Sequence, residues 1–292
     1  MKHGLSPIEI TKANGEKSTF ESKKLFESLL RSGADRTESQ GIVDSIADEL
    51  YPGISTKEIY RKAFSLLRSR SRVLAARYNL KNAIMQLGPS GYPFEKYIGS
   101  ILQHQGYRVQ VAKLVQGQCV NHEVDVIAEK GDEHFMIECK YHNQQGTLSD
   151  VKIPLYINSR FLDVSGRWQK QPGHHIKFHQ GWVITNTRFT LDALQYGKCA
   201  GLRMIGWDYP TKGSLKDMID TLGLYPITAI TSLTLNEKKD LLAKGIVLCL
   251  EISSNQQLLA ETGIKENRSK VILNECKSLC HFIKNAHALP VL

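Results

Sequence analysis

Alternation of polar and apolar residues predicts a β-hairpin near the start of the chain. IEITK at 8–12 alternates as a short strand does, and EKSTF after it is expected to form the return strand. The Asn14-Gly15 step between them favours a tight hairpin turn. Ser18 or Thr19 is expected to cap the helix that follows, because a hydroxyl can accept a backbone N–H of the first helical turn.

Four helices are expected between this hairpin and residue 87, because apolar residues recur there every three or four positions. Ser55 or Thr56 is expected to cap the third. The four helices are expected at about 20–32, 37–50, 56–71 and 72–87. The segment LGPSGYP at 87–93 then holds two glycines and two prolines, which predicts a domain boundary.

The next segment, 91–210, switches repeatedly between helical and extended patterns. One helix, three strands, a helix, a strand, a helix and a final strand are expected, which is typical of a mixed α/β domain with a central sheet. The expected elements are helix 94–106, strands 107–115, 122–129 and 134–142, helix 148–163, strand 181–187, helix 190–201 and strand 202–208.

The last segment, 211–292, is expected to be mostly helical. LLAKGI at 241–246 and LLAETGI at 258–264 are similar, since each is a helix end followed by glycine and an apolar residue. Gly245 and Gly263 therefore fit helix C-caps or helix-hairpin-helix turns that hold a DNA phosphate with backbone N–H groups. The C-cap interpretation is favoured, because no lysine-rich hairpin accompanies both copies.

Composition narrows the class of protein. With 292 residues, 41% of them hydrophobic, the chain can form two or three domains with real cores. A net charge of +9 favours a polyanionic partner such as nucleic acid. No apolar stretch has the length of a membrane helix, and the first residues lack the apolar core of a signal peptide. Six scattered cysteines fit reduced thiols, so a cytoplasmic location is expected.

Charged residues interrupt two apolar strands of the central segment. Side chains alternate faces along a strand, so Glu138 and Lys140 share one face while Ile137 and Cys139 share the other. The polar turn before them predicts an antiparallel hairpin that places Asp125 beside Glu138. Two carboxylates in a buried setting need a compensating charge, and Mg²⁺ commonly binds one or two carboxylates plus water. The alternative is a solvent-facing ion pair, which contributes little stability.

Asp125, followed by E-C-K at 138–140 and preceded by a helix carrying Glu95, resembles the signature of the PD-(D/E)XK nuclease superfamily. HEVDV, IECKYH and WVITNT, in the expected αβββαβ order, look most like the Mrr-type restriction endonucleases of that superfamily. The resemblance covers about 91–210.

The resemblance implies a role for each residue of the signature. Asp125 and Glu138 would be Mg²⁺ ligands, and the backbone carbonyl of Cys139 would complete the protein contacts of the metal. Lys140 would orient or activate the attacking water and stabilise charge in the transition state. Glu95 would help to position metal or water, although a glutamate in a first helical turn is also favoured by the helix dipole.

The N-terminal segment resembles the ATP-cone, a nucleotide-sensing domain of ribonucleotide reductases and of their transcriptional repressor. ITKANGEKSTF, KKLFESL and AARYNL occur in that order over about 6–90. The resemblance implies a β-hairpin capping four helices, with Lys12, Lys23 and Lys24 contacting the phosphates of ATP or dATP. The turn contains KANG, where family members typically have lysine-arginine-aspartate-glycine.

A second interpretation of this segment comes from its charge. From Arg61 to Lys81 the chain carries seven basic residues and no acidic one. Such a run fits contact with a DNA backbone or a solvated helix face. A small helical DNA-binding or dimerising domain is therefore the alternative to the ATP-cone.

Together these features predict a multidomain α/β protein with an ATP-cone at 1–90, an Mrr-like PD-(D/E)XK nuclease at 91–210 and a helical C-terminal region at 211–292. The expected function is a Mg²⁺-dependent DNA endonuclease of restriction or defence, regulated by ATP or dATP. A homo-oligomer is expected, since one such site cuts one strand. The alternatives are a catalytically silent, nucleotide-responsive DNA-binding regulator, and an RNA or repair nuclease on the same fold.

Overall fold

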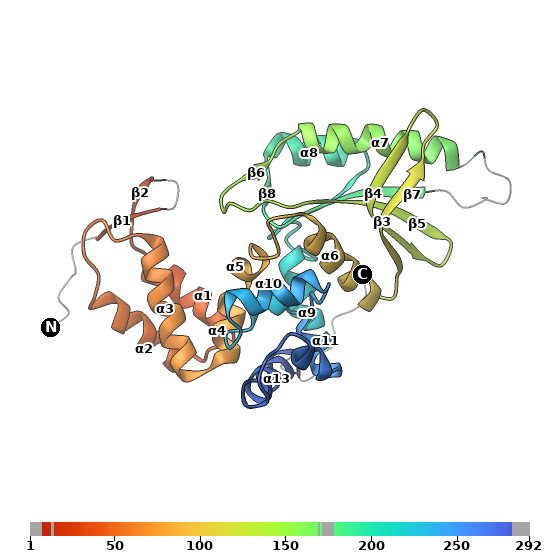
Figure 1. The fold of residues 1–292 in the computed structure, drawn as a ribbon. Helices are drawn as coiled ribbons and strands as arrows, with labels where there is room; N and C mark the ends of the chain where they lie inside the picture. The colour runs from red at the N-terminus through yellow and green to blue at the C-terminus, as the bar shows by residue number, and fades with distance from the viewer. Residues whose placement is uncertain (1–7, 13–14, 169, 171–177, 282–292) are drawn as a thin grey trace.

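The computed structural model describes residues 8–12, 15–168, 170 and 178–281 (Figure 1). A helical N-terminal unit lies at one end of the molecule, a β-sheet with flanking helices lies at the other, and the C-terminal helices lie beneath the sheet. The expected turn at Ala13 and Asn14 falls outside the described residues. No helix within those ranges is long and apolar enough to cross a bilayer.

The N-terminal unit is a two-stranded hairpin packed against helices. Its strands pair antiparallel, with Ile10 opposite Ser18. A shared apolar core includes Ile10 of the hairpin and the fully buried Leu29, Ile42 and Leu67 of three helices. The elements of the unit are β1 (Glu9–Thr11), β2 (Lys17–Thr19), α1 (Ser22–Arg31), α2 (Arg36–Ala47), α3 (Thr56–Arg70), α4 (Arg72–Tyr78) and α5 (Leu80–Ile84).

One of the two expected helix caps is wrong. Ser18 and Thr19 pair within the hairpin as part of β2, so α1 begins only after Glu21, whose side chain makes no capping bond. The cap of α3 is confirmed, because the Ser55 side chain accepts the backbone N–H of Glu58 at 3.1 Å.

The single helix expected at 72–87 is also wrong, because the chain divides there at Asn79 into α4 and α5. The Tyr60 hydroxyl of α3 donates to Oδ1 of Asn79 at 2.6 Å, and the ring of Tyr60 stacks on Tyr78 with centroids 4.9 Å apart. A tertiary contact therefore fixes the residue at which the helix divides.

The central domain contains a five-stranded mixed sheet in the order β3-β4-β5-β7-β9. β3, β4 and β5 are antiparallel, whereas β5, β7 and β9 are parallel. The expected order of helices and strands is therefore observed. The elements are α6 (Tyr92–His104), β3 (Arg108–Gln116), β4 (Asn121–Lys130), β5 (Glu133–Lys140), β6 (Leu148–Ser149), α7 (Lys152–Trp168), β7 (Phe178–Thr185), β8 (Arg188–Phe189), α8 (Leu191–Cys199) and β9 (Arg203–Ile205).

The helix expected from residue 148 begins later, at Lys152. Leu148 and Ser149 instead form β6, which pairs in parallel with β8 through Arg188 and Phe189. The backbone groups of the two short strands satisfy one another, so the chain stays extended until after Asp150.

Helices cover both faces of the sheet (Figure 1). On one face Val183 and Met136 pack against Ile157 and Val164 of α7. On the other face Phe135, Ile137 and Cys139 of β5 join α6 and the C-terminal helices in one continuous core. The period-2 alternation expected along β5 is therefore confirmed, with apolar residues on both sides of a fully covered strand.

The C-terminal region packs on the α6 side of the sheet and continues its core. The Tyr97 hydroxyl of α6 donates to the carbonyl of Leu224 at 2.7 Å. The elements are α9 (Leu215–Leu222), one turn of 3₁₀ helix (Ile227–Ala229), α10 (Leu235–Ala243), α11 (Cys249–Ser254), α12 (Gln257–Glu261) and α13 (Glu266–His281).

The two similar glycines of this region are helix C-caps. Gly245 and Gly263 have φ of 77° and 75°, a left-handed conformation that favours glycine. Ile246 donates back to the carbonyl of Leu241 at 2.9 Å. Ile264 donates in the same way to the carbonyl of Leu259 at 3.2 Å, so both helices end in a Schellman motif.

Candidate functional site

The hairpin of β4 and β5 brings Asp125 against the end of β5. Val126 lies opposite Ile137, and because the strands are antiparallel the residue before Val126, Asp125, meets the backbone after Ile137. Oδ2 of Asp125 accepts the backbone N–H of Cys139 at 2.7 Å. This bond fixes the Asp125 carboxylate between Glu138 and Cys139, and its other oxygen stays available for a further partner.

The neighbouring strand is irregular at the same level of the sheet. β3 and β4 pair regularly on either side of Ala112 and Asp125. Ala112 has φ of 52° and is, within the described residues, the one non-glycine with a positive φ. A left-handed alanine costs roughly 1–2 kcal/mol, so the surrounding structure holds strained backbone beside Asp125.

Glu138 is largely but not completely buried at this point, with 18% of its side chain exposed. Burial and the nearby carboxylate of Asp125 raise the pKa of Glu138 from its usual 4.5 to about 7. Nη1 of Arg160 donates to Oε2 of Glu138 at 2.6 Å, which lowers that pKa without overcoming the effect of burial.

Glu95 reaches the same place from the first turn of α6. Burial raises its pKa to about 7, and repulsion by Asp125 and Glu123 adds to the effect. Glu95 in turn raises the pKa of Glu138. Three carboxylates from α6, β4 and β5 therefore lie close enough to repel one another, and they hold protons that isolated carboxyl groups would release.

Lys140 ends β5 beside this cluster. It lies opposite Thr185 of β7, and its ammonium lowers the pKa of Asp125, which burial raises. The next residue, Tyr141, donates its hydroxyl to the carbonyl of Met85 at 2.7 Å. The end of the strand is thereby tied to the segment that follows α5.

Arg160 of α7 is a site residue that the sequence did not identify. Its side chain is 10% exposed, and it contacts Glu138 and the backbone carbonyl of Glu123. Ile157, Arg160 and Val164 recur at a spacing of three and four residues, which puts the arginine on the buried face of the helix. An arginine on an apolar helical face was the available signal, because a buried charge requires a partner.

The donor set fits Mg²⁺. Asp125 and Glu138 supply carboxylate oxygens, and Cys139 supplies a backbone carbonyl. Magnesium typically takes one or two carboxylates and keeps several waters. Among the described residues no group of three or more His, Cys, Asp and Glu side chains is arranged as a metal centre, so the cluster does not form a cage made by the protein alone. The repulsion among its carboxylates is the feature that a bound cation would relieve.

The raised pKa values predict how the stability of the metal-free protein depends on pH. A carboxyl group whose pKa is higher in the folded than in the unfolded state lowers the free energy of unfolding as the pH rises from about 4.5 to about 7. Glu95→Gln is expected to remove its share of this loss. That share is on the order of 1 kcal/mol after discounting for solvent around the half-buried carboxyl.

Urea unfolding at pH 5 and pH 8 in chelator measures this effect. The variant is expected to lose less stability than the wild type between the two conditions. Glu133→Gln, on the turn side of β5, is the matched control and is expected to keep the wild-type difference. An unchanged pH dependence in Glu95→Gln would contradict the electrostatic coupling of the three carboxylates.

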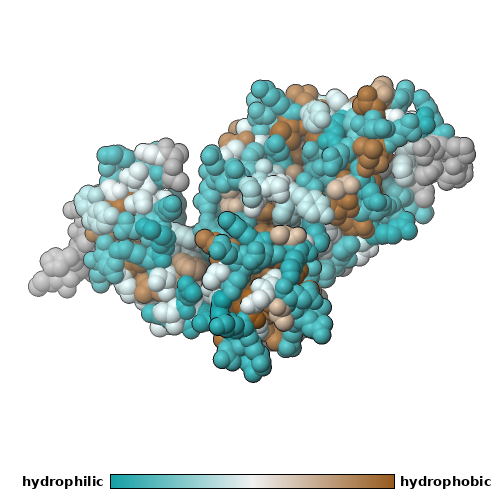
Figure 2. Space-filling model, in the orientation of Figure 1, coloured by the Kyte–Doolittle hydropathy of each residue, from teal (hydrophilic) through white to brown (hydrophobic). Residues whose placement is uncertain are grey.

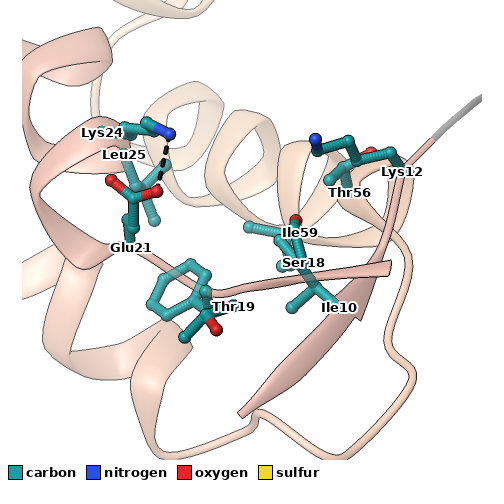
Figure 3. A pocket seen from close by; sticks show the side chains of 10 residues that line it. Ile10, Lys12, Ser18, Thr19, Glu21, Lys24, Leu25, Thr56 and Ile59 are labelled. Carbon is teal, nitrogen blue, oxygen red and sulfur yellow. Dashed lines mark hydrogen bonds and ion pairs between the residues drawn. The ribbon is translucent and has the colours of Figure 1, made fainter. Parts of the chain in front are cut away.

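The lysines expected to contact nucleotide do not share one location. Lys12 and Lys24 line a pocket of about 290 Å³ between the hairpin and helices α1 and α3. Figure 3 shows the two lysines on opposite sides of the pocket, with Ile10, Leu25 and Ile59 among its apolar lining. Lys23 is exposed and is not among the residues that line it.

Both pocket lysines form surface ion pairs. Lys12 lies 3.1 Å from Glu16, and Lys24 lies 2.6 Å from Glu21. Exposed pairs of this kind are weak, so a phosphate can replace either glutamate at small cost.

Comparison with known proteins identifies the family. Residues 225–280 match the family model described as AF1548-like, C-terminal. A protein of Archaeoglobus fulgidus that carries the name "Uncharacterized protein" is 33% identical over 180 residues, which cover 61% of this chain and 97% of that protein. The chain belongs to the AF1548-like family. The solved structure titled "Crystal Structure of Protein of Unknown Function AF1548" matches with a TM-score of 0.54 and 32% identity, covering 65% of this chain and 98% of that one.

A second family model matches the central domain of this AF1548-like protein. Residues 88–153 match the model described as Restriction endonuclease. This segment contains α6 and the β3-β4-β5 sheet, and hence Glu95, Asp125, Glu138 and Lys140. The AF1548-like chain therefore carries a restriction-endonuclease-like domain, which supports a nuclease of the PD-(D/E)XK type.

Proposed function

We propose that this protein is a Mg²⁺-dependent DNA endonuclease of Mrr type that hydrolyses phosphodiester bonds in restriction or defence. The observation that carries the proposal is the convergence of Glu95, Asp125 and Glu138 beside Lys140, within the segment that matches the restriction endonuclease model. Carboxylates that repel one another next to a lysine are poorly suited to stabilising a fold. They are well suited to binding a cation next to a phosphate.

Each residue has a distinct role in the proposed reaction. Asp125, Glu138 and the carbonyl of Cys139 would hold Mg²⁺, which when bound supplies Lewis acidity toward the scissile phosphate. Lys140 would orient the attacking water and place a positive charge where the transition state becomes more negative. Glu95 would accept a hydrogen bond from the same water or from a water bound to the cation.

Metal removal is the direct test of this function. Purified wild-type protein is expected to nick or linearise supercoiled plasmid in Mg²⁺ and to lose that activity completely in EDTA. Restored Mg²⁺ should restore cleavage. A shift of the plasmid band in gel electrophoresis without nicking, across several divalent cations and nucleotides, would instead support a catalytically silent DNA-binding regulator. Cleavage of RNA alone would support an RNA nuclease on the same fold.

We also propose that ATP or dATP binds at the N-terminal unit and regulates the nuclease. The pocket beside Lys12 and Lys24 supports this, because it joins apolar walls that suit a base to two cations that suit phosphates.

Exposed leucines support the proposed homo-oligomer. Leu155 and Leu162 of α7 are 43% and 59% exposed, and Leu191 of α8 is 84% exposed. Figure 2 shows apolar side chains reaching the surface in the upper part of the molecule, where Figure 1 places α7 and α8.

A double replacement of Lys12 and Lys24 by alanine is expected to weaken ATP binding by about 10-fold or more per lysine, because each removes a charge-assisted phosphate contact. Isothermal titration calorimetry measures the affinity. Parallel titrations with ATP and dATP should change the mass in analytical ultracentrifugation or the nicking rate of the wild type. Lys17→Ala is the control, since Lys17 pairs with Glu9 on the same hairpin and does not line the pocket. Equal affinity in the double variant and the wild type would contradict the site.

A further inference from the structure

Arg160 is a buried cation on the helix that covers the candidate site. Its neighbours on the inner face of α7, Ile157 and Val164, are almost completely buried. An arginine in such surroundings loses most of its hydration, so the groups that it contacts have to compensate the cost of desolvation.

Three contacts hold the Arg160 guanidinium, and they come from three elements. Nη1 donates to Oε2 of Glu138 in β5 at 2.6 Å. Nη2 donates to the backbone carbonyl of Glu123 in β4. The ring of Tyr156, one turn earlier in α7, lies 5.4 Å from the guanidinium carbon. Because the planar group is fixed at both terminal nitrogens and over one face, its orientation is determined by the fold and not by Glu138 alone.

This arrangement constrains Glu138 more than the other carboxylates of the cluster. One carboxylate oxygen is engaged by Arg160, and the other is left for a different partner. Among the described residues, Arg160 and Lys140 lower the pKa of Asp125, and Arg160 also lowers the pKa of Glu138.

We propose that Arg160 is a positioning residue that holds Glu138 in the orientation needed to bind a divalent cation. The inference rests on the proposed function, since it assumes that Glu138 is a cation ligand. Arg160 acts through Glu138 and through the β4 backbone at Glu123, two residues before Asp125. Outer groups that orient metal ligands in this way typically change metal affinity by about 10- to 100-fold when they are removed.

The positive charge of Arg160 also repels a dication. This repulsion lowers cation affinity, whereas the positioning of Glu138 raises it. Lysine separates the two effects. Arg160→Lys keeps the charge but cannot bind Glu138 and the Glu123 carbonyl in the same plane. A positioning role predicts weaker cation binding in Arg160→Lys and still weaker binding in Arg160→Met. A role limited to charge predicts wild-type binding in Arg160→Lys and tighter binding in Arg160→Met.

The test measures Mn²⁺ affinity by electron paramagnetic resonance on the full-length protein without DNA. Arg160→Met is expected to weaken binding by about 10-fold or more. In a Glu138→Gln background the same replacement is expected to change affinity by less than about threefold, because the ligand that Arg160 positions is already lost. Arg167→Met, on the same helix and in contact with Gln116, is the control and should bind as the wild type does. Urea unfolding of each variant shows whether it is folded at the titration conditions.

The outcomes distinguish failure of the positioning role from failure of the proposed function. Weaker binding in both Arg160 variants, absent in the Glu138→Gln background, supports the positioning role. If the wild type binds Mn²⁺ and Asp125→Asn does not, but both Arg160 variants bind as tightly as the wild type or more tightly, the positioning role is wrong and the proposed function stands. If the wild type shows no Mn²⁺ binding that depends on Asp125, the proposed function itself fails. A loss of folding in Arg160→Met with unchanged affinity in Arg160→Lys would assign Arg160 to stability alone.

Discussion

Asp125→Asn is expected to abolish divalent-cation binding and to slow DNA cleavage by at least about 10³-fold, which corresponds to roughly 4 kcal/mol of transition-state stabilisation. Asparagine has the shape of aspartate, and its carbonyl oxygen can still accept the N–H of Cys139 that Asp125 accepts at 2.7 Å. The fold should therefore be retained. The negative charge is lost, and with it the attraction for a cation at the point where the three carboxylates meet.

Plasmid cleavage in Mg²⁺ and Mn²⁺ affinity measure the two effects of this replacement. Asp132→Asn is the matched control, because Asp132 lies exposed in the turn of the same hairpin. It should cleave and bind as the wild type does. Wild-type cleavage by Asp125→Asn would remove Asp125 from the catalytic site and with it the proposed mechanism.

Lys140→Met is expected to separate cation binding from catalysis. Methionine fills a similar length of apolar stem but removes the ammonium, so cleavage should fall by about 10²- to 10⁴-fold, as is usual when a positioned catalytic group is lost. Mn²⁺ affinity should stay within a few fold of the wild type or increase, since Lys140 is a cation and donates nothing to the metal. A variant that loses the chemistry but keeps the cation would distinguish the role of Lys140 from that of Asp125.

Two controls accompany this variant. Lys113→Met removes an exposed lysine from β3 and is expected to leave cleavage unchanged. Lys140→Arg retains the charge with a different geometry and should recover part of the rate. Full cleavage by Lys140→Met, or a loss of Mn²⁺ binding as severe as that of Asp125→Asn, would show that Lys140 has a different role.

Much of the nuclease core was predictable because its strands are covered on both sides. Both faces of β5 are buried, so Phe135, Met136 and Ile137 are all apolar although they alternate between the two faces. The charged Glu138 and Lys140 were therefore easy to recognise as exceptions. The polar turn before β5 fixed the pairing of the hairpin, and pairing placed Asp125 next to Glu138. Local sequence and alternation were sufficient for this part of the site.

The features that could not be predicted depend on contacts between segments far apart in the chain. Arg160 reaches Glu138 and Glu123 only because α7 crosses the face of the sheet, and sequence spacing gives no such distance. Asn79 divides a helix because Tyr60 of α3 binds it. Hydroxyls at 18 and 19 were plausible caps by residue type, but strand pairing used their backbone first.

The boundary between the N-terminal core and the nuclease core limits where the chain can be truncated. Leu74 and Ala75 of α4 are buried in the N-terminal core, whereas Ala76, directly after them, is buried in the core of the nuclease. The residues from 76 to 87, which precede the Gly-Pro-rich segment, supply four more buried side chains to the nuclease: Leu80, Ala83, Ile84 and Leu87. A fragment that starts at the Gly-Pro-rich segment near residue 90 would lack these side chains and would expose the apolar surface that they cover in the nuclease. Helix α4 thus contributes to both cores, and a fragment of either half must include it to keep its core complete.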